Sequence, residues 1–134
     1  MRKELEAVLE AVDLVFANEQ EACGLTDQAD AATAAQMLSR RCGTVAVTRG
    51  PLGSIVATRT EVVSVPAAEV SRVVDSTGAG DSYAAGFLYG VVGDRSPSDC
   101  ARLGALAAAE VVSHLGARPL QSLAALAAEA GLLD

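Results

Sequence analysis

The sequence predicts an α/β fold in which helices cover both faces of a mainly parallel sheet. Two short apolar runs, at 14–17 and 44–48, are typical of buried strands, and segments of helical periodicity lie beside them. The composition agrees, because 51% of the 134 residues are hydrophobic but only 3% are aromatic. The core must therefore be built from alanine, valine and leucine, which suit helices laid on a parallel sheet. A chain of this length accommodates one domain.

Periodicity and turn residues divide the chain into elements. Asp30 opens a helix that Gly43 ends, and Pro97 opens another that Gly116 terminates. The turn at 49–53 joins two strands as a hairpin. The expected helices are 2–12, one that starts after Asn18, 30–42, 79 to about 91, 97–114 and one that ends near 131; the expected strands are 13–17, 44–48, 54–58, 61–66 and 73–74.

The chain is acidic, with a formal net charge of −7 and an isoelectric point near 4.6. This argues against nucleic acid or an anionic membrane as a partner. An acidic protein that binds a polyanion has to concentrate positive potential locally, at helix N-termini, at a few arginines or at bound cations.

Cysteine usage and hydropathy predict a soluble protein of the cytoplasm. Cys23, Cys42 and Cys100 are widely spaced and form no C-x-x-C pair, as expected for thiols in a reducing compartment. No apolar run reaches the ~18 residues needed to span a bilayer. The first residues lead into an acidic amphipathic pattern, unlike a signal peptide.

The most informative stretch is a glycine-rich turn between a β-branched pair and a predicted helix. Gly78, Ala79 and Gly80 let the backbone turn tightly and approach a ligand without interference from bulky side chains. The helix that starts there leaves its first N–H groups unpaired, and its dipole adds roughly half a positive charge at that end. The turn is therefore a predicted phosphate site that needs no lysine.

Asp81 follows this turn directly and has two interpretations. A carboxylate in a first helical turn is common and stabilises the helix by about 0.3–1 kcal/mol. Alternatively, an acid beside a phosphate-binding turn lies within reach of a hydroxyl that attacks the phosphate. A general base placed there typically contributes about 10²–10⁴-fold to the rate.

The segment 75–81 reads DSTGAGD and resembles the second signature, D-[ST]-T-G-A-G-D, of the ribokinase-like (PfkB) carbohydrate and nucleoside kinases. The resemblance implies a three-layer, Rossmann-like sheet with helices on both faces. It also implies that the glycine turn is an anion hole for ATP and that Asp81 is the catalytic base. Asp75 and Thr77 match positions that help to bind an activating monovalent cation, such as K⁺, in many relatives.

Asn18 followed by Glu21 is close to a capping box, and most N-x-x-E occurrences mean no more than a helix start. The kinase family has an N-x-x-E motif after a strand, as here. Its glutamate helps to organise Mg²⁺ and the phosphates, usually through water. Both roles are compatible, because a residue can cap a helix with one atom while the neighbouring turn addresses a cation.

The turn after strand 44–48 also resembles the family, in which a V-T-x-G-x-x-G segment borders the nucleotide. Thr48, Gly50 and Gly53 match that segment. Arg49 occupies the variable position, where it either faces a phosphate or is simply solvated. His114 is the single histidine, and its place near a helix C-terminus suits a structural cap more than a ligand role.

The resemblance covers nearly all of 1–134, yet only the carboxy-terminal half of the family pattern, so the half that recognises the substrate and forms the lid is absent. Residues 110–119 resemble bacterial adenosine kinases and favour a nucleoside over ribose, fructose or another sugar. Two hypotheses follow: part of an ATP-dependent kinase, or a catalytically silent module for nucleotide binding or association. Half a sheet leaves an unpaired edge, which predicts oligomerisation.

Overall fold

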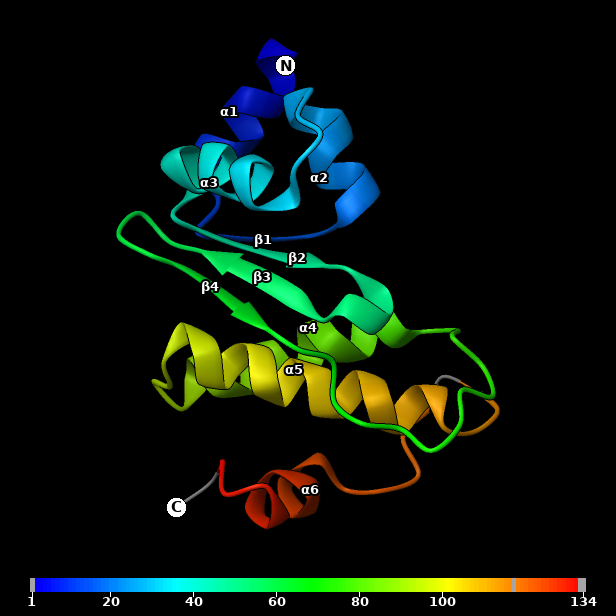
Figure 1. Cartoon of the computed structure of the whole chain (residues 1–134). Coiled ribbons are helices and arrows are strands. Elements are labelled where there is room, and N and C mark those ends of the chain that lie inside the picture. Colours follow the sequence, from blue (N-terminus) through cyan, green and yellow to red (C-terminus); the bar gives the residue numbers. More distant parts are fainter. Residues whose placement is uncertain (1, 117, 133–134) are drawn as a thin grey trace. The chain divides into compact units, whose positions relative to one another are not determined.

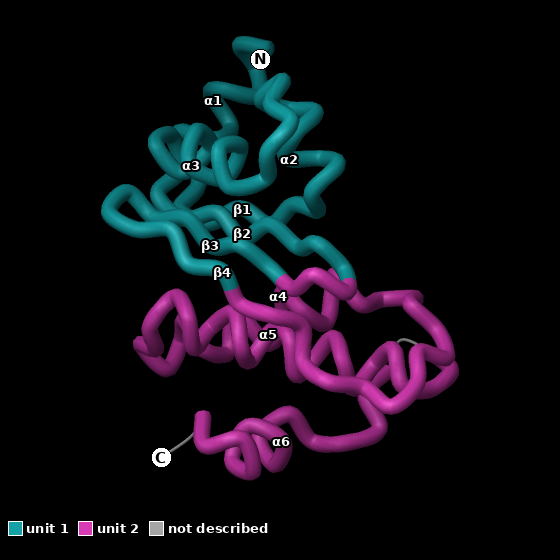
Figure 2. The backbone as a smooth tube through the Cα atoms, in the orientation of Figure 1, with its two compact units in different colours: residues 1–50, 54–64 teal, residues 51–53, 65–134 magenta. Residues whose placement is uncertain are grey.

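The structure is a computed structural model that describes residues 2–116 and 118–132. The chain divides into two compact units (Figure 2). The first comprises residues 1–50 and 54–64, and the second comprises residues 51–53 and 65–134.

The described part of the first unit contains three α-helices, two of which begin at a side-chain cap. α1 spans Lys3–Ala11, α2 spans Glu19–Thr26 and α3 spans Ala31–Cys42. Asp30 caps α3 by accepting a hydrogen bond from the Thr33 amide at 2.9 Å, and Gly43 ends the helix at a positive φ of 105°. The predicted helices and their caps are thus confirmed in this half of the chain.

The sheet has four strands in the order β1-β2-β3-β4 (Figure 1). These are β1 (Leu14–Asn18), β2 (Thr44–Thr48), β3 (Ser54–Ala57) and β4 (Val62–Val65). β1 and β2 are parallel, whereas β2 and β3 are antiparallel, which confirms the predicted hairpin. The parallel register pairs Asn18 with Thr48, so the carboxyl ends of these two strands lie side by side.

The core of the first unit lies between its helices and one face of the sheet. Leu38 of α3 and Val45 and Val47 of β2 are fully buried in it, together with alanines of α2 and α3. β1 departs from the prediction of a strand covered on both faces. Leu14, Val15 and Phe16 are only half-buried, because β1 lies at one edge of the described sheet. An unpaired strand edge is what the sequence predicts for a chain that matches only half of the family pattern.

The second unit is a helical layer built from α4 (Ala79–Val92), α5 (Pro97–Val112) and α6 (Leu123–Glu129). Its helices approach closely where glycines lack a side chain. A Cβ at Gly86 would lie 2.5 Å from the carbonyl oxygen of Leu103, and one at Gly104 would lie 2.8 Å from the ring of Tyr83. Close packing therefore explains these small residues.

Two sequence predictions in this unit are wrong. Val73 and Val74 are not a strand: their side chains are 63% and 40% exposed, and the amide of Val74 donates to the carbonyl of Val112 at 2.7 Å instead of to a neighbouring strand. The two valines therefore have side chains typical of a strand, but no neighbouring strand pairs with them among the described residues. The second error is at the end of α5, which stops at Val112 and not at His114.

Candidate active site

The glycine turn of the second unit has the predicted helical exit, but its entry is not the strand that the sequence predicted. Gly78 adopts a left-handed conformation (φ 79°, ψ 4°), and α4 begins at the next residue, Ala79. Asp81 lies in the first turn of α4 and is exposed. The positive φ explains the glycine at 78, because residues with a Cβ adopt this conformation at a cost.

The backbone amides of this turn differ in whether they donate a hydrogen bond to another described residue. The Ala79 amide donates to the carbonyl of Ser76 at 3.2 Å. The amides of Gly80 and Asp81 meet no acceptor among the residues that the structure describes. They belong to the first helical turn, where N–H groups lack intrahelical partners, so they can bind an anion.

Asp75 fixes the entry to the turn with both of its carboxylate oxygens. Oδ1 accepts a hydrogen bond from the Thr77 amide at 2.9 Å, and Oδ2 accepts one from the Gly116 amide at 3.2 Å. Hydrogen bonds from the Thr77 side chain, the Thr77 amide and the Gly116 amide hold the pKa of Asp75 below its usual range. Asp75 is therefore an ionised anchor, and a cation at Asp75 and Thr77 would have to share oxygens that already accept from amides.

At the end of β1 the first unit forms a complete capping box. The Asn18 side chain accepts from the Glu21 amide at 2.8 Å, and Glu21 Oε1 accepts from the Asn18 amide at 3.0 Å. The interpretation as a helix cap is confirmed. The box uses one side-chain oxygen of each residue, and both residues are exposed.

The exposed carboxylate of Glu21 fits a water-mediated contact with Mg²⁺, an ion that usually keeps several of its waters. Glu21 alone does not form a metal site made only of protein ligands. Within residues 2–116 and 118–132, no three histidine, cysteine or acidic side chains are grouped to hold a metal ion.

Arg49 forms an ion pair that the sequence did not indicate. Its Nε donates to Glu19 Oε2 at 2.8 Å, in a half-exposed ion pair beside Asn18 and Thr48. An ion pair of this exposure contributes little to stability, about 0–1 kcal/mol, and so it can open. In the closed ion pair the guanidinium lies near the carboxyl ends of β1 and β2.

The two glycines after Arg49 both adopt a positive φ, as the turn prediction requires. Gly50 has a φ of 54° in open space. Gly53 has a φ of 93°, and a Cβ there would lie 2.1 Å from the carbonyl oxygen of Val65. Gly53 is thus required by its backbone contacts within the second unit, whereas Gly50 is required by conformation alone.

A comparison with family models decides the relationship. Residues 1–123 match the model described as pfkB family carbohydrate kinase. The chain belongs to this family. The same membership accounts for the mixed sheet and confirms the predicted ribokinase-like α/β fold class.

Individual pfkB relatives agree with this assignment. The chain is 36% identical over 115 residues to a cytidine kinase of Thermococcus kodakarensis, covering 84% of this chain and 41% of that protein. It superposes on a probable sugar kinase of Rhizobium etli CFN 42 with a TM-score of 0.91 and 41% identity, over 97% of this chain and 40% of the other. For an adenosine kinase of Sinorhizobium meliloti the TM-score is 0.88 and the identity is 45%, over 96% of this chain and 40% of the other. This pfkB chain therefore spans less than half the length of these relatives.

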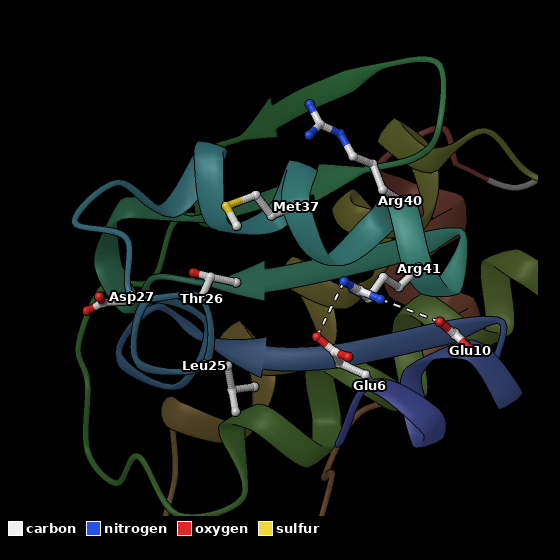
Figure 3. Close-up of a pocket in the computed structure, with 8 residues that line it drawn as sticks. All are labelled: Glu6, Glu10, Leu25, Thr26, Asp27, Met37, Arg40 and Arg41. Carbon is white, nitrogen blue, oxygen red and sulfur yellow. Dashed lines mark hydrogen bonds and ion pairs between the residues drawn. The ribbon is translucent and has the colours of Figure 1, made fainter. Parts of the chain in front are cut away.

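A hollow of about 530 Å³ lies apart from the predicted site residues of the pfkB chain, among the helices of the first unit (Figure 3). Arg41 forms ion pairs there with Glu6 and Glu10, each at 3.4 Å. The lining residues are Glu6, Glu10, Leu25, Thr26, Asp27, Met37, Arg40 and Arg41. The hollow contributes no residue to the predicted phosphate or magnesium contacts.

Sequence reasoning missed Glu110, a buried carboxylate of α5 that is 8% exposed. Its Oε1 accepts from His114 Nε2 at 2.8 Å, so His114 is held by a side chain rather than acting only as a helix cap. A signal for Glu110 was present, because it follows Leu103 and Leu106 at helical spacing on an apolar stripe.

No described helix of this pfkB chain is both long and apolar enough to cross a membrane.

Proposed function

We propose that the chain is part of an ATP-dependent phosphotransferase that acts on an alcohol group of a sugar or nucleoside. The observation that carries this proposal is the start of α4 in a pfkB family chain. There a left-handed Gly78 leads into a helix whose early amides are unpaired, and the exposed Asp81 follows at once. The remaining length of the relatives would supply the rest of the substrate site.

In this proposal Asp81 accepts the proton of the attacking hydroxyl. The turn at Gly78, Ala79 and Gly80 stabilises the negative charge that develops on the transferred phosphoryl group. The amides of Gly80 and Asp81 are ready for this role, whereas that of Ala79 would be shared with Ser76. No lysine is required at the turn, because the helix dipole and amides supply the positive potential.

The other predicted site residues would supply separate roles. Glu21 would contact Mg²⁺ through water, because its carboxylate is exposed and engaged through one oxygen only. Thr48, Arg49, Gly50 and Gly53 would border the nucleotide, in keeping with the family segment that they match. Mg²⁺, when bound, neutralises charge on the phosphates during transfer. A monovalent cation such as K⁺ at Asp75 and Thr77 would keep the entry to the turn ordered.

We favour a nucleoside, adenosine in particular, as the substrate. Two observations support this: the 45% identity to an adenosine kinase and the resemblance of residues 110–119 to such enzymes. Sugar kinases are also among the similar proteins, so ribose and fructose are the competing substrates. We place the protein in the cytoplasm, since Cys23, Cys42 and Cys100 are free thiols, as is usual in a reducing compartment.

The test begins with binding. Magnesium ADP is titrated into the isotope-labelled chain, and backbone amide shifts are followed by NMR. We expect the Gly80 and Asp81 amides to shift with the ligand. Phosphoryl transfer from ATP to adenosine, ribose and fructose is then assayed on the same preparation. Binding without transfer would favour the silent nucleotide-binding module, and the absence of any shift at the turn would refute the phosphate site.

A further inference from the structure

The second unit contains a buried carboxylate whose hydrogen bonds converge on a single atom. Glu110 Oε1 accepts from His114 Nε2 at 2.8 Å, from the Leu120 amide at 2.8 Å and from the Gln121 amide at 3.2 Å. Glu110 therefore ties the end of α5 to the chain that follows it.

The other oxygen of this carboxylate argues against a role in helix stability alone. Glu110 Oε2 is buried and has no hydrogen-bond partner among the described residues. Burying a carboxyl group with an unsatisfied oxygen is unfavourable, so helix stability alone does not explain an acidic residue at this position of α5. The three donors at Oε1 indicate a different role, which is to fix residues 113–116 and 118–121 after α5.

His114 connects Glu110 to the backbone of the next residue, Leu115. Its Nδ1 lies 3.0 Å from the carbonyl of Leu115, while its Nε2 faces Glu110. Both ring nitrogens face oxygen atoms, an arrangement in which a doubly protonated ring donates two hydrogen bonds. The contact with Leu115 and the neighbouring carboxylate of Glu110 raise the pKa of His114, in agreement with a charged imidazole.

The fixed segment in turn holds the entry to the glycine turn. Gly116 donates its amide to Asp75 Oδ2, and the carbonyl of Val112 accepts from the amides of Val74 (2.7 Å) and Asp75 (3.2 Å). Asp75 then receives the Thr77 amide, one residue before Gly78. A continuous chain of hydrogen bonds within one unit thus leads from Glu110 to the turn.

We propose that Glu110 is a positioning residue for the glycine turn, acting through the loop that carries His114 and Gly116 and through Asp75. The importance of this for phosphoryl transfer rests on the proposed function, but the mechanical link itself does not. If Glu110 merely joined α5 to α6, its loss would loosen Leu120 and Gln121 and leave Asp75 and Thr77 in place.

Backbone amide hydrogen exchange, measured by NMR on the chain without ligand, separates these two roles. In Glu110→Ala we expect the Thr77 and Gly116 amides to exchange about tenfold faster or more, because the loop that holds them opens locally. Glu110→Gln keeps an acceptor at Oε1 and should retain most of their protection. Val111→Ala is the control, since it removes a fully buried side chain from the same helix and leaves the hydrogen bonds intact.

The proposal is overturned if Thr77 and Gly116 keep their protection in Glu110→Ala while Leu120 and Gln121 lose theirs. It is equally overturned if Val111→Ala exposes Thr77 and Gly116 as much, because general destabilisation would then explain the effect. Should Glu110→Ala fail to fold, His114→Ala provides the same measurement, since it removes one donor from Oε1 near the surface. Protection of Thr77 and Gly116 that survives unchanged in His114→Ala would then refute the link.

The ADP titration distinguishes failure of this inference from failure of the proposed function. If wild-type amides at 80–81 do not shift with magnesium ADP but Glu110→Ala still exposes Thr77, the positioning role holds and the phosphate site is wrong. If ADP binds the wild type and Glu110→Ala equally well and exchange at Thr77 is unchanged, the phosphate site holds and the positioning role is wrong.

Discussion

The two regions that carry the predicted site residues are held in different ways. At the end of β1, Asn18 and Glu21 fix each other through a capping box that spans three residues. At the start of α4, Asp75 reaches Gly116, 41 residues away in the sequence, and relies on the end of α5. The strand end is thus specified locally, whereas the glycine turn depends on the packing of its whole unit.

This difference predicts how far damage spreads. A change within the capping box should remain near α2, because its partners are its neighbours in sequence. A change in the α4–α5 packing should reach the turn, because the turn shares its anchors with α5. The following experiments challenge this contrast.

The largest effect is expected on catalysis. To provide the missing length, residues 1–134 would replace the matching 40% of the Sinorhizobium meliloti adenosine kinase. In this chimera Asp81→Asn should lower kcat by about 10²-fold or more and leave nucleotide affinity nearly unchanged, because a base acts on the transition state rather than on ATP binding. Steady-state kinetics and ADP titration measure the two quantities.

Asp94→Asn is the matched control for this variant. It removes the same charge just beyond the other end of α4, at a left-handed position (φ 56°) that asparagine accepts well. Equal losses of kcat in both variants would mean that the general field of the helix matters and that Asp81 is not the base.

The next effect concerns packing of the second unit. Gly86→Ala places a methyl group 2.5 Å from a backbone oxygen of α5, which cannot move independently. We expect a loss of about 1–3 kcal/mol in the free energy of unfolding, with chemical-shift changes that extend to Gly78. Gly24→Ala in α2 meets nothing within 4 Å and should stabilise the chain by about 0.5–1 kcal/mol. Urea denaturation measures both, and a neutral Gly86→Ala would contradict the close approach.

A smaller and local effect is expected at the strand end. Asn18→Ala removes the acceptor for the Glu21 amide and should cost about 1 kcal/mol of stability. Asn18→Asp keeps that acceptor and serves as the control. Amide exchange in Asn18→Ala should rise in the first turn of α2 only, and a loss of protection at Gly116 would contradict the local character of this region.

The smallest effect is a pH dependence from His114. Its pKa is raised in the fold by the Leu115 carbonyl and by Glu110, with a weaker contribution from Asp75. A raised pKa stabilises the protonated form, so this contribution is complete below the unfolded value of about 6.5 and is lost as the pH rises through the native pKa. The unfolding free energy of the wild type should therefore fall slightly above pH 6.5, and His114→Gln should lack this component. An identical pH profile in the two proteins would contradict the ionised ring.

Local signals carried much of the fold prediction. The capping box at Asn18, the Asp30 cap, the helix start at Pro97, the hairpin at 49–53 and the start of α4 were all predicted from short patterns and are present. These features succeed because their partners lie within a few residues. The role of Asp81 as a base stays a prediction, because it concerns a reacting hydroxyl that belongs to the substrate.

The errors share a physical cause. Val73 and Val74 have strand-like side chains, but a strand needs a partner strand, and the carbonyl of Val112 accepts from the Val74 amide instead. Arg49 likewise forms an ion pair with Glu19, 30 residues earlier, that the sequence did not indicate, and its place beside the nucleotide stays a prediction. In each case a contact distant in sequence decided the outcome.

The sequence by itself determined the family signature, the helix caps and the left-handed glycines, because each depends on the conformational preferences of a few adjacent residues. Only the tertiary structure decided that Asp75 is clamped by Gly116 and that Glu110 gathers three donors on one buried oxygen. Such contacts form when α5 and the loop after it fold back together, and no local pattern encodes the distance between them.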